Sequence, residues 1–240
     1  MTDATLSSIP ASALDRIPPD LARDLIAVAG RNHLHLFLRQ IFGIVVPQEP
    51  LVDNWHLRAI CHALEQVARG EIRRLIVTLP PRSLKSIIAS VAYPAWVLGR
   101  DPAARIVCVS YSRDLAGKHS RDFRAVLRSE RYRRTFPRLQ IDAGTEFEMV
   151  TTRRGGRFST SIDGTLTGRG GNLIVIDDPL KAQDAYSEAA RARVNDWFDK
   201  TALSRLDNKR QDAIVVVTQR LHEEDLVGHL LEHGGWTHLC

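Results

Sequence analysis

Residues 74–86 read RLIVTLPPRSLKS, and this stretch decides the fold that the sequence predicts. Its first half is apolar and β-branched, which is typical of a buried strand. Pro80 and Pro81 end that strand, because proline has no amide hydrogen to donate to a neighbouring strand. Lys85 and Ser86 then open a run of small apolar residues that predicts a helix. A strand, a tight loop and a helix in this order are typical of a phosphate-binding loop.

The chemistry of such a loop is that of backbone amides and one lysine. Amides at a helix N-terminus point at a phosphate and carry partial positive charge. Lys85 would add a full charge there, and the hydroxyl of Ser86 would be a ligand for Mg²⁺. The usual pattern, G-x-x-x-x-G-K-[ST], has glycines where this chain has Leu79 and Leu84. The alternative for this stretch is an ordinary strand–helix corner with a surface lysine.

Composition indicates a globular protein of one domain with a small appendage. The chain has 240 residues, of which 44% are hydrophobic and 25% charged. Its net charge of +5 favours a polyanionic partner, although basic surfaces are often only solvated. No apolar run approaches the ~20 residues of a membrane span, and no signal peptide is evident. Three widely spaced cysteines suit a reducing compartment. We therefore expect a cytoplasmic protein without a membrane partner.

Apolar strands alternate with helices along the rest of the chain, which predicts an α/β fold with a mostly parallel sheet covered on both faces. Residues 1–20 predict a loose N-terminal arm. The predicted buried strands are residues 75–79, 105–111, 173–176 and 213–220, a hairpin covers 146–150 and 157–161, and the predicted helices are 21–41 (a pair broken near Gly30), 55–68 (capped by Asn54 and ended by Gly70), 114–127, 187–206 and 223–231.

Two acidic residues, Asp177 and Asp178, follow the predicted strand 173–176. A buried strand that delivers a carboxylate to the edge of the sheet is the second half of a P-loop site, where that carboxylate holds Mg²⁺. A second acid beside it can orient an attacking water. The alternative is a pair of aspartates that caps the next helix.

Polar residues also end the predicted strand 213–220, with the sequence Thr218-Gln219-Arg220. In open α/β sheets, ligands bind beside the carboxyl ends of central strands, so these groups are placed to sense a γ-phosphate. The alternative is a strand that simply reaches solvent.

Four motifs taken together resemble the ATPase half of the large subunit of tailed-phage terminases. The resemblance spans about residues 50–235, and its motifs keep the family's order and plausible spacing. The motifs are residues 80–86 (PPRSLKS), 164–171 (GTLTGRGG), 174–179 (IVIDDP) and 218–226 (TQRLHEEDL).

The resemblance implies a P-loop NTPase of the additional-strand class that uses ATP and Mg²⁺ to push double-stranded DNA into a procapsid. Such ATPases act as a homo-oligomeric ring on the portal protein, together with the terminase small subunit, in the cytoplasm of the host bacterial cell. It also implies that residues 47–240 form the ATPase domain and residues 1–46 an N-terminal arm with helices.

Site roles follow by position from the same resemblance. The residues that would bind the nucleotide are Pro81, Arg82, Ser83, Leu84, Lys85 and Ser86 in the loop, Trp55 (beside His56) at the adenine side, and Thr218 and Gln219 in a motif that couples hydrolysis to movement. The metal ligands would be Ser86 and Asp177. The aromatic ring of Trp55 is alternatively a residue of the helix core.

Three residues would be catalytic. Asp178 stands where many members of the family have a glutamate, and its side chain is shorter by one methylene. Arg82 would face the phosphates. Arg169 would be an arginine finger offered to a neighbouring subunit, with a loop arginine that faces DNA or solvent as the alternative.

A run of basic residues predicts a surface that contacts DNA phosphates in a salt-sensitive way, or else a solvated basic face. These residues are Arg113, Lys118, Arg121, Arg124, Arg128, Arg131, Arg133 and Arg134.

Large terminases continue into an RNase H-like nuclease with two metal ions. This chain ends at Cys240, in what reads as a further strand, so we expect no nuclease activity of it. A fragment, a split gene and a prophage remnant are the alternatives. Two other functions stay open: a helicase-like nucleic-acid-dependent ATPase, and a truncated, inactive remnant that binds DNA or portal without turnover.

Overall fold

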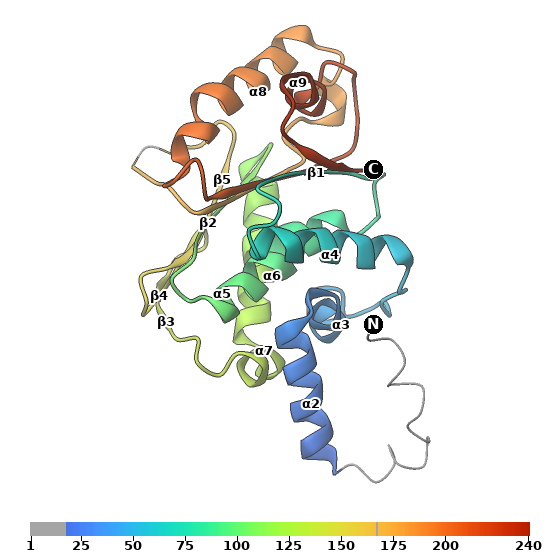
Figure 1. Cartoon of the computed structure of the whole chain (residues 1–240), viewed down its shortest axis with the longest axis vertical. Helices are drawn as coiled ribbons and strands as arrows, with labels where there is room; N and C mark the ends of the chain where they lie inside the picture. The colour runs from blue at the N-terminus through green and yellow to red at the C-terminus, as the bar shows by residue number, and fades with distance from the viewer. Residues whose placement is uncertain (1–17, 167) are drawn as a thin grey trace.

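The computed structural model describes residues 18–166 and 168–240, and its centre is one eight-stranded sheet. The strands lie in the order β3-β4-β5-β2-β6-β7-β1-β8 (Figure 1). The strand bounds are β1 Arg74–Thr78, β2 Arg105–Ser110, β3 Ile141–Gly144, β4 Glu148–Thr151, β5 Gly156–Ser161, β6 Leu173–Asp177, β7 Ala213–Thr218 and β8 Thr237–Leu239. The predicted arm, residues 1–20, lies almost entirely outside the described residues.

Strand β7 lies between β1 and β6 and is parallel to both. The loop-bearing strand and the strand that ends in Asp177 are therefore separated by one further strand, which is the arrangement of additional-strand P-loop proteins. Strands β2, β5 and β8 are also parallel to their neighbours in this part of the sheet. Among the described strands only β4 runs in the opposite direction: it is antiparallel to β3 on one side and to β5 on the other, and it forms the predicted hairpin with β5. The predicted fold class is confirmed.

Helices cover both faces of this sheet (Figure 1). Figure 1 shows α8 and α9 on one face and α3 to α7 on the other. The α-helices are α2 Pro19–Asn32, α3 Leu34–Val45, α4 Trp55–Ala68, α5 Tyr93–Arg100, α6 Arg113–Arg128, α7 Glu130–Thr135, α8 Glu188–Lys200 and α9 Leu226–His233; η1 Ile87–Ala92 is a π-helix, and η2 Ala182–Asp184 and η3 Ala202–Arg205 are short 3₁₀ turns.

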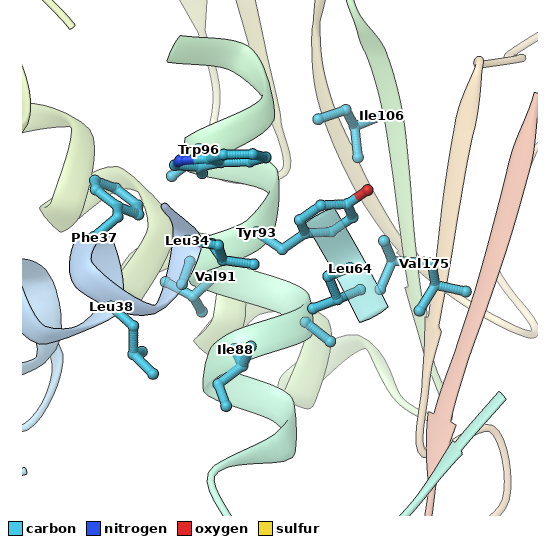
Figure 2. Packing of buried hydrophobic residues seen from close by; sticks show 14 of the residues in the cluster. Leu34, Phe37, Leu38, Leu64, Ile88, Val91, Tyr93, Trp96, Ile106 and Val175 are labelled. Atoms are coloured by element: carbon cyan, nitrogen blue, oxygen red, sulfur yellow. The ribbon is translucent and has the colours of Figure 1, made fainter. Parts of the chain in front are cut away.

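Successive side chains of the central strands point to opposite faces of the sheet, so that a hydrophobic core lies on each face. In β1, Leu75 and Val77 belong to the core under α3 to α7, whereas Ile76 belongs to the core under α8 and α9. The first core is the larger. Its buried side chains include Phe37 of α3 and Trp96 of α5, and Figure 2 shows them packed between the helices.

Helix α3 is part of this core, since Leu34, Phe37, Leu38 and Ile41 are completely or almost completely buried. The buried indole of Trp96 also donates a hydrogen bond to the carbonyl of Gly30 in α2, at 3.0 Å. The two N-terminal helices are thus tied to α5, which lies beyond the predicted phosphate-binding loop.

Two sequence-based details are wrong and a third is slightly displaced. The predicted break of the helical pair is present, but it lies at His33, which is extended, and Gly30 itself lies inside α2. Trp55 is not a core residue: it is the first residue of α4 and is 72% exposed. The long predicted helix 187–206 ends at Lys200 and continues as a 3₁₀ turn.

Helix ends elsewhere follow the predicted signals. The side chain of Asn54 accepts a hydrogen bond from the amide of Trp55, and Gly70 adopts the positive φ of 76° that ends α4. Across the described ranges, no helix is both long and apolar enough to cross a membrane.

Candidate nucleotide-binding site

The loop between β1 and η1 leads directly into a helix whose first amides are free to bind an anion. Strand β1 ends at Thr78, and the amide of Leu79 still donates to the carbonyl of Thr218 at 3.1 Å. The first amide bond of the following helix runs from Ile88 to the carbonyl of Leu84, at 3.0 Å. The amides before Ile88 belong to the unsatisfied first turn, which is the anion-binding feature of a P-loop.

Two non-glycine residues of this loop, Arg82 and Leu84, adopt left-handed backbone conformations, with φ of 63° and 62°. Leu84 stands at the position of the second glycine of the usual pattern, where a positive φ is needed. The backbone of the loop therefore keeps the glycine-type conformation although the side chain is leucine. Such a conformation costs a non-glycine residue about 1–2 kcal/mol. The side chain of Leu84 packs against the larger core, which offsets part of that cost.

Asp177 is the last residue of β6 and is completely buried. Ser86 donates a hydrogen bond to its Oδ1 at 2.9 Å, and Ser90 donates to its Oδ2 at 2.7 Å. The two predicted metal ligands, Ser86 and Asp177, are therefore in direct contact although 91 positions separate them in the sequence.

Asp178 follows directly and faces Lys85. Its Oδ2 lies 3.5 Å from the Nζ of Lys85, which is itself buried, and its Oδ1 is buried without a hydrogen-bond partner. Asp178 has a φ of 45°, a conformation that aspartate tolerates better than most residues. Its amide donates to the carbonyl of Val217 at 2.8 Å, so β7 holds the turn in which both aspartates lie.

Burial dominates the electrostatics of both carboxylates. It raises the pKa of Asp177, while the hydroxyls of Ser90 and Ser86 and the charge of Lys85 act in the opposite direction. Burial also raises the pKa of Asp178, with the neighbouring charge of Asp177 as the second cause. A cation at this place would relieve the repulsion between two buried carboxylates.

The donor set at this place fits Mg²⁺. The hydroxyl of Ser86 and the carboxylate of Asp177 are hard oxygen ligands, and Mg²⁺ is usually held by one or two carboxylates together with phosphate oxygens and water. The next residue, Asp178, adds a further oxygen, its Oδ1, which is buried and has no hydrogen-bond partner among the described residues. Among residues 18–166 and 168–240, no group of three or more His, Cys, Asp or Glu side chains could hold a metal ion alone.

Thr218 and Gln219 lie at the carboxyl end of β7, between the ends of β1 and β6. Thr218 is buried and pairs with Thr78 in the β1–β7 register. The hydroxyl of Thr78 in turn contacts Nε2 of His238 on β8, at 2.8 Å. The predicted coupling motif is thus adjacent to the loop and to both aspartates.

Three predicted site residues stand apart from this cluster or make no contact with it. Arg169 forms an ion pair with Glu148 and stacks on the ring of Phe158, at 4.3 Å, over the β4–β5 hairpin. Arg82 is exposed and makes no side-chain hydrogen bond among the described residues. Trp55 is exposed on α4.

Intramolecular partners occupy much of the predicted basic face. Arg121 pairs with Glu146 at 2.7 Å, Lys118 pairs with Asp122 at 2.9 Å, and Arg113 stacks on the ring of Phe147. These side chains remain largely exposed, and their ion pairs lie at the surface, where such pairs are weak.

Three polar residues behind Asp177 were missed by the sequence analysis. His119 of α6 is buried, with its Nδ1 3.5 Å from Oδ2 of Asp177, and burial lowers its pKa to about 4, so that it is neutral at pH 7. Ser90 lies in η1, and Arg157 lies buried on β5. Ser90 is a single polar residue in an apolar segment, and His119 and Arg157 lie among other polar residues of their own elements, so none of the three carries a signal of its own in the sequence.

No family model and no curated protein matches this chain in sequence. Phage large terminases are among the solved structures that are similar to it. The HK97 bacteriophage large terminase has 16% sequence identity and a TM-score of 0.49, over 79% of this chain and 39% of that chain. An arginine-to-alanine mutant of the Thermus phage P74-26 large terminase ATPase domain has 17% identity and a TM-score of 0.43, over 75% and 69%. The chain thus spans well under half of the HK97 protein. The fold assignment rests on the strand order and the loop.

Proposed function

We propose that this chain is the ATPase motor domain of a phage large terminase, which hydrolyses ATP with Mg²⁺ to drive double-stranded DNA into procapsids. The observation that carries the proposal is the meeting of Lys85, Ser86 and Asp177 at the carboxyl ends of β1 and β6, with β7 between them. A lysine, a hydroxyl and a carboxylate in this arrangement are the parts that phosphoryl transfer uses.

Each residue then has a role. The amides of residues 81–86 and the Nζ of Lys85 bind the phosphates, and Ser86 and Asp177 hold Mg²⁺, which neutralises charge on the phosphates when bound. Asp178 orients the attacking water with its free Oδ1. Lys85, whose Nζ lies 3.5 Å from Asp178, exchanges this partner for the phosphates when the nucleotide binds. Arg82 faces the phosphates, Trp55 the adenine, and Thr218 and Gln219 report the state of the γ-phosphate to β7.

The assembly belongs to the proposal as well. Residues 47–240 form the motor domain and residues 1–46 an arm with helices, and the motor acts as a ring with portal protein and small subunit in the host cytoplasm. Arg169 is the residue proposed to reach a neighbouring subunit, for which it must leave Glu148. The exposed arginines of α6 and α7 are proposed to contact DNA phosphates.

ATP turnover by the purified chain tests the proposal. We expect hydrolysis that requires Mg²⁺, rises with duplex DNA, and disappears in Lys85→Ala. Lys209→Ala removes an exposed lysine far from this loop in the sequence and serves as the matched control. The absence of turnover in the wild-type chain, at concentrations that permit assembly, would exclude a working motor and favour a remnant that only binds. Separation of a forked duplex would favour a helicase-like enzyme.

A further inference from the structure

Arg157 is a buried, positively charged residue that has no role in the site as described so far. It is 2% exposed, and its guanidinium stacks on the ring of Phe123 at 4.8 Å. It donates hydrogen bonds to the hydroxyl of Ser159 and to the carbonyl of Ser90, the latter at 3.0 Å. No carboxylate lies within 4.0 Å of its nitrogens in the described part of the chain. Because a buried charge without an ion-pair partner costs several kcal/mol, its position calls for a physical reason.

That reason lies in the helix after the phosphate-binding loop. Within η1 the amide of Tyr93 donates to the carbonyl of Ile88, five positions earlier and not four. In an α-helix the carbonyl of Ser90 would accept from residue 94, which is Pro94 and has no amide hydrogen. A proline ring also crowds the carbonyl four positions before it, which widens or breaks the helix. Arg157 supplies the donor that Pro94 lacks.

Ser90 carries this contact on to the site. Its carbonyl accepts from Arg157, and its hydroxyl donates to Oδ2 of Asp177 at 2.7 Å. All three residues are at most 2% exposed, so water does not compete for these bonds. The chain of contacts runs from β5 through η1 to the end of β6, and joins three elements that no local sequence signal connects.

We propose that Arg157 is a positioning residue for the metal-binding carboxylate. By holding the Ser90 carbonyl it fixes the Ser90 hydroxyl on Oδ2 of Asp177, and so keeps Oδ1 directed at Ser86 and the metal position. The metal role of Asp177 comes from the proposed function, on which this inference rests. Partners that orient a metal ligand typically contribute 10–100-fold to metal affinity.

The affinity of the full chain for Mn²⁺ in the presence of ADP tests the inference. It is measured from the electron paramagnetic resonance signal of the unbound Mn²⁺. We expect Arg157→Met and Ser90→Ala each to weaken Mn²⁺ binding about 10–100-fold. The double variant is expected to bind Mn²⁺ no less tightly than whichever single variant binds it less tightly, because both substitutions act through the same contacts. Arg153→Met removes an exposed arginine in the β4–β5 connection and is expected to leave the affinity unchanged.

A folded Arg157→Met variant with wild-type affinity for Mn²⁺ would overturn the inference. If that variant does not fold, Arg157→Lys and Ser90→Ala test the inference instead. Lysine keeps the positive charge and can still donate a hydrogen bond. We therefore expect Arg157→Lys to bind Mn²⁺ less tightly than wild type but more tightly than Ser90→Ala. Wild-type affinity in Ser90→Ala would equally overturn it.

A second readout does not depend on nucleotide or metal. Amide hydrogen exchange of residues 91–93 in the metal-free chain is expected to be about tenfold faster or more in Arg157→Lys than in Arg153→Met, because η1 loses part of its support. If the wild-type chain binds no Mn²⁺ with ADP, the proposed function fails, and unchanged exchange in Arg157→Lys would show separately that the contact positions nothing.

Discussion

Leu84 holds a left-handed backbone conformation, with φ of 62°, at the point where the loop turns into its helix. A Cβ in this region is crowded by its own carbonyl, whereas glycine adopts it without cost. Leucine at this position therefore has two opposing effects: its side chain packs against the core, and its backbone is strained. Substitutions at this one position separate the two effects.

We expect Leu84→Gly to be more stable than Leu84→Ala by about 1 kcal/mol. Both variants lose the leucine packing, and only glycine relieves the strain, so the difference between them isolates the backbone. In an ordinary helical position the order is the reverse. Urea denaturation of the two variants measures the difference, and an alanine variant as stable as the glycine variant would show that φ carries no cost here.

His119 predicts a pH dependence of stability. Burial lowers its pKa from 6.5 to about 4 in the folded chain, so the unfolded chain binds the proton more readily. The stability contribution of this residue is complete above pH 6.5 and is lost as the pH falls toward 4, by about 3 kcal/mol in all. Denaturation of wild type and His119→Asn at pH 7, 6 and 5 measures this loss. The difference in stability between the two should shrink as the pH falls; a constant difference would contradict the assignment.

At the residue scale, the sequence was sufficient for side chains that belong to contiguous motifs. Lys85, Ser86 and Asp177 could be singled out because a loop or a strand end surrounds each of them, and the structure brings them together. Ser90 and Arg157 could not be, since their contact depends on a strand and a helix 67 positions apart.

Two helical glycines show how closely the elements around the site are packed. A Cβ on Gly99 of α5 would lie 2.3 Å from the ring of Phe136, whereas a Cβ on Gly43 of α3 would meet nothing within 4 Å. The first helix packs tightly against the segment after α7, and the second presents this position to solvent.

We therefore expect Gly99→Ala to destabilise the chain by about 1–3 kcal/mol, because the ring of Phe136 has to move. Gly43→Ala should instead stabilise it by about 0.5–1 kcal/mol, since alanine restricts the unfolded chain and fits the helix. Thermal unfolding of both variants compares them directly, and equal shifts of the same sign would contradict the packing described for α5.

Element types were predictable where periodicity was strong, and boundaries were not. The four buried strands and the hairpin follow from apolar runs and glycine pairs, and Asn54 and Gly70 mark the ends of α4. The π-helix was not predicted, because the effect of Pro94 depends on a donor from β5. The two alternatives for Trp55 could not be separated in advance, because an aromatic residue at a helix start is compatible with either exposure or burial.

At the scale of the whole molecule, the order of the strands positions the chemistry. Strand β7 separates β1 from β6 and holds the turn of Asp178 through the carbonyl of Val217. The sequence predicted a parallel sheet from continuous apolar strands, but their order depends on pairing between distant segments and came into the prediction only with the resemblance. The two cores on opposite faces then fix the strand ends relative to one another.

The central claim is that the ends of β1 and β6 form one site for a nucleotide and Mg²⁺. Calorimetric titration of the chain with ADP, with and without Mg²⁺, tests it most directly. The variants are Lys85→Ala, Asp177→Asn and the control Lys209→Ala, each checked for wild-type thermal unfolding.

We predict that wild type and Lys209→Ala bind ADP more tightly with Mg²⁺. Lys85→Ala should lose at least tenfold in affinity, since a charge-assisted bond to phosphate contributes about 1.5–3 kcal/mol. Asp177→Asn should bind ADP equally with and without Mg²⁺. Wild-type affinity in Lys85→Ala, or an undiminished effect of Mg²⁺ in Asp177→Asn, would contradict the account of this site.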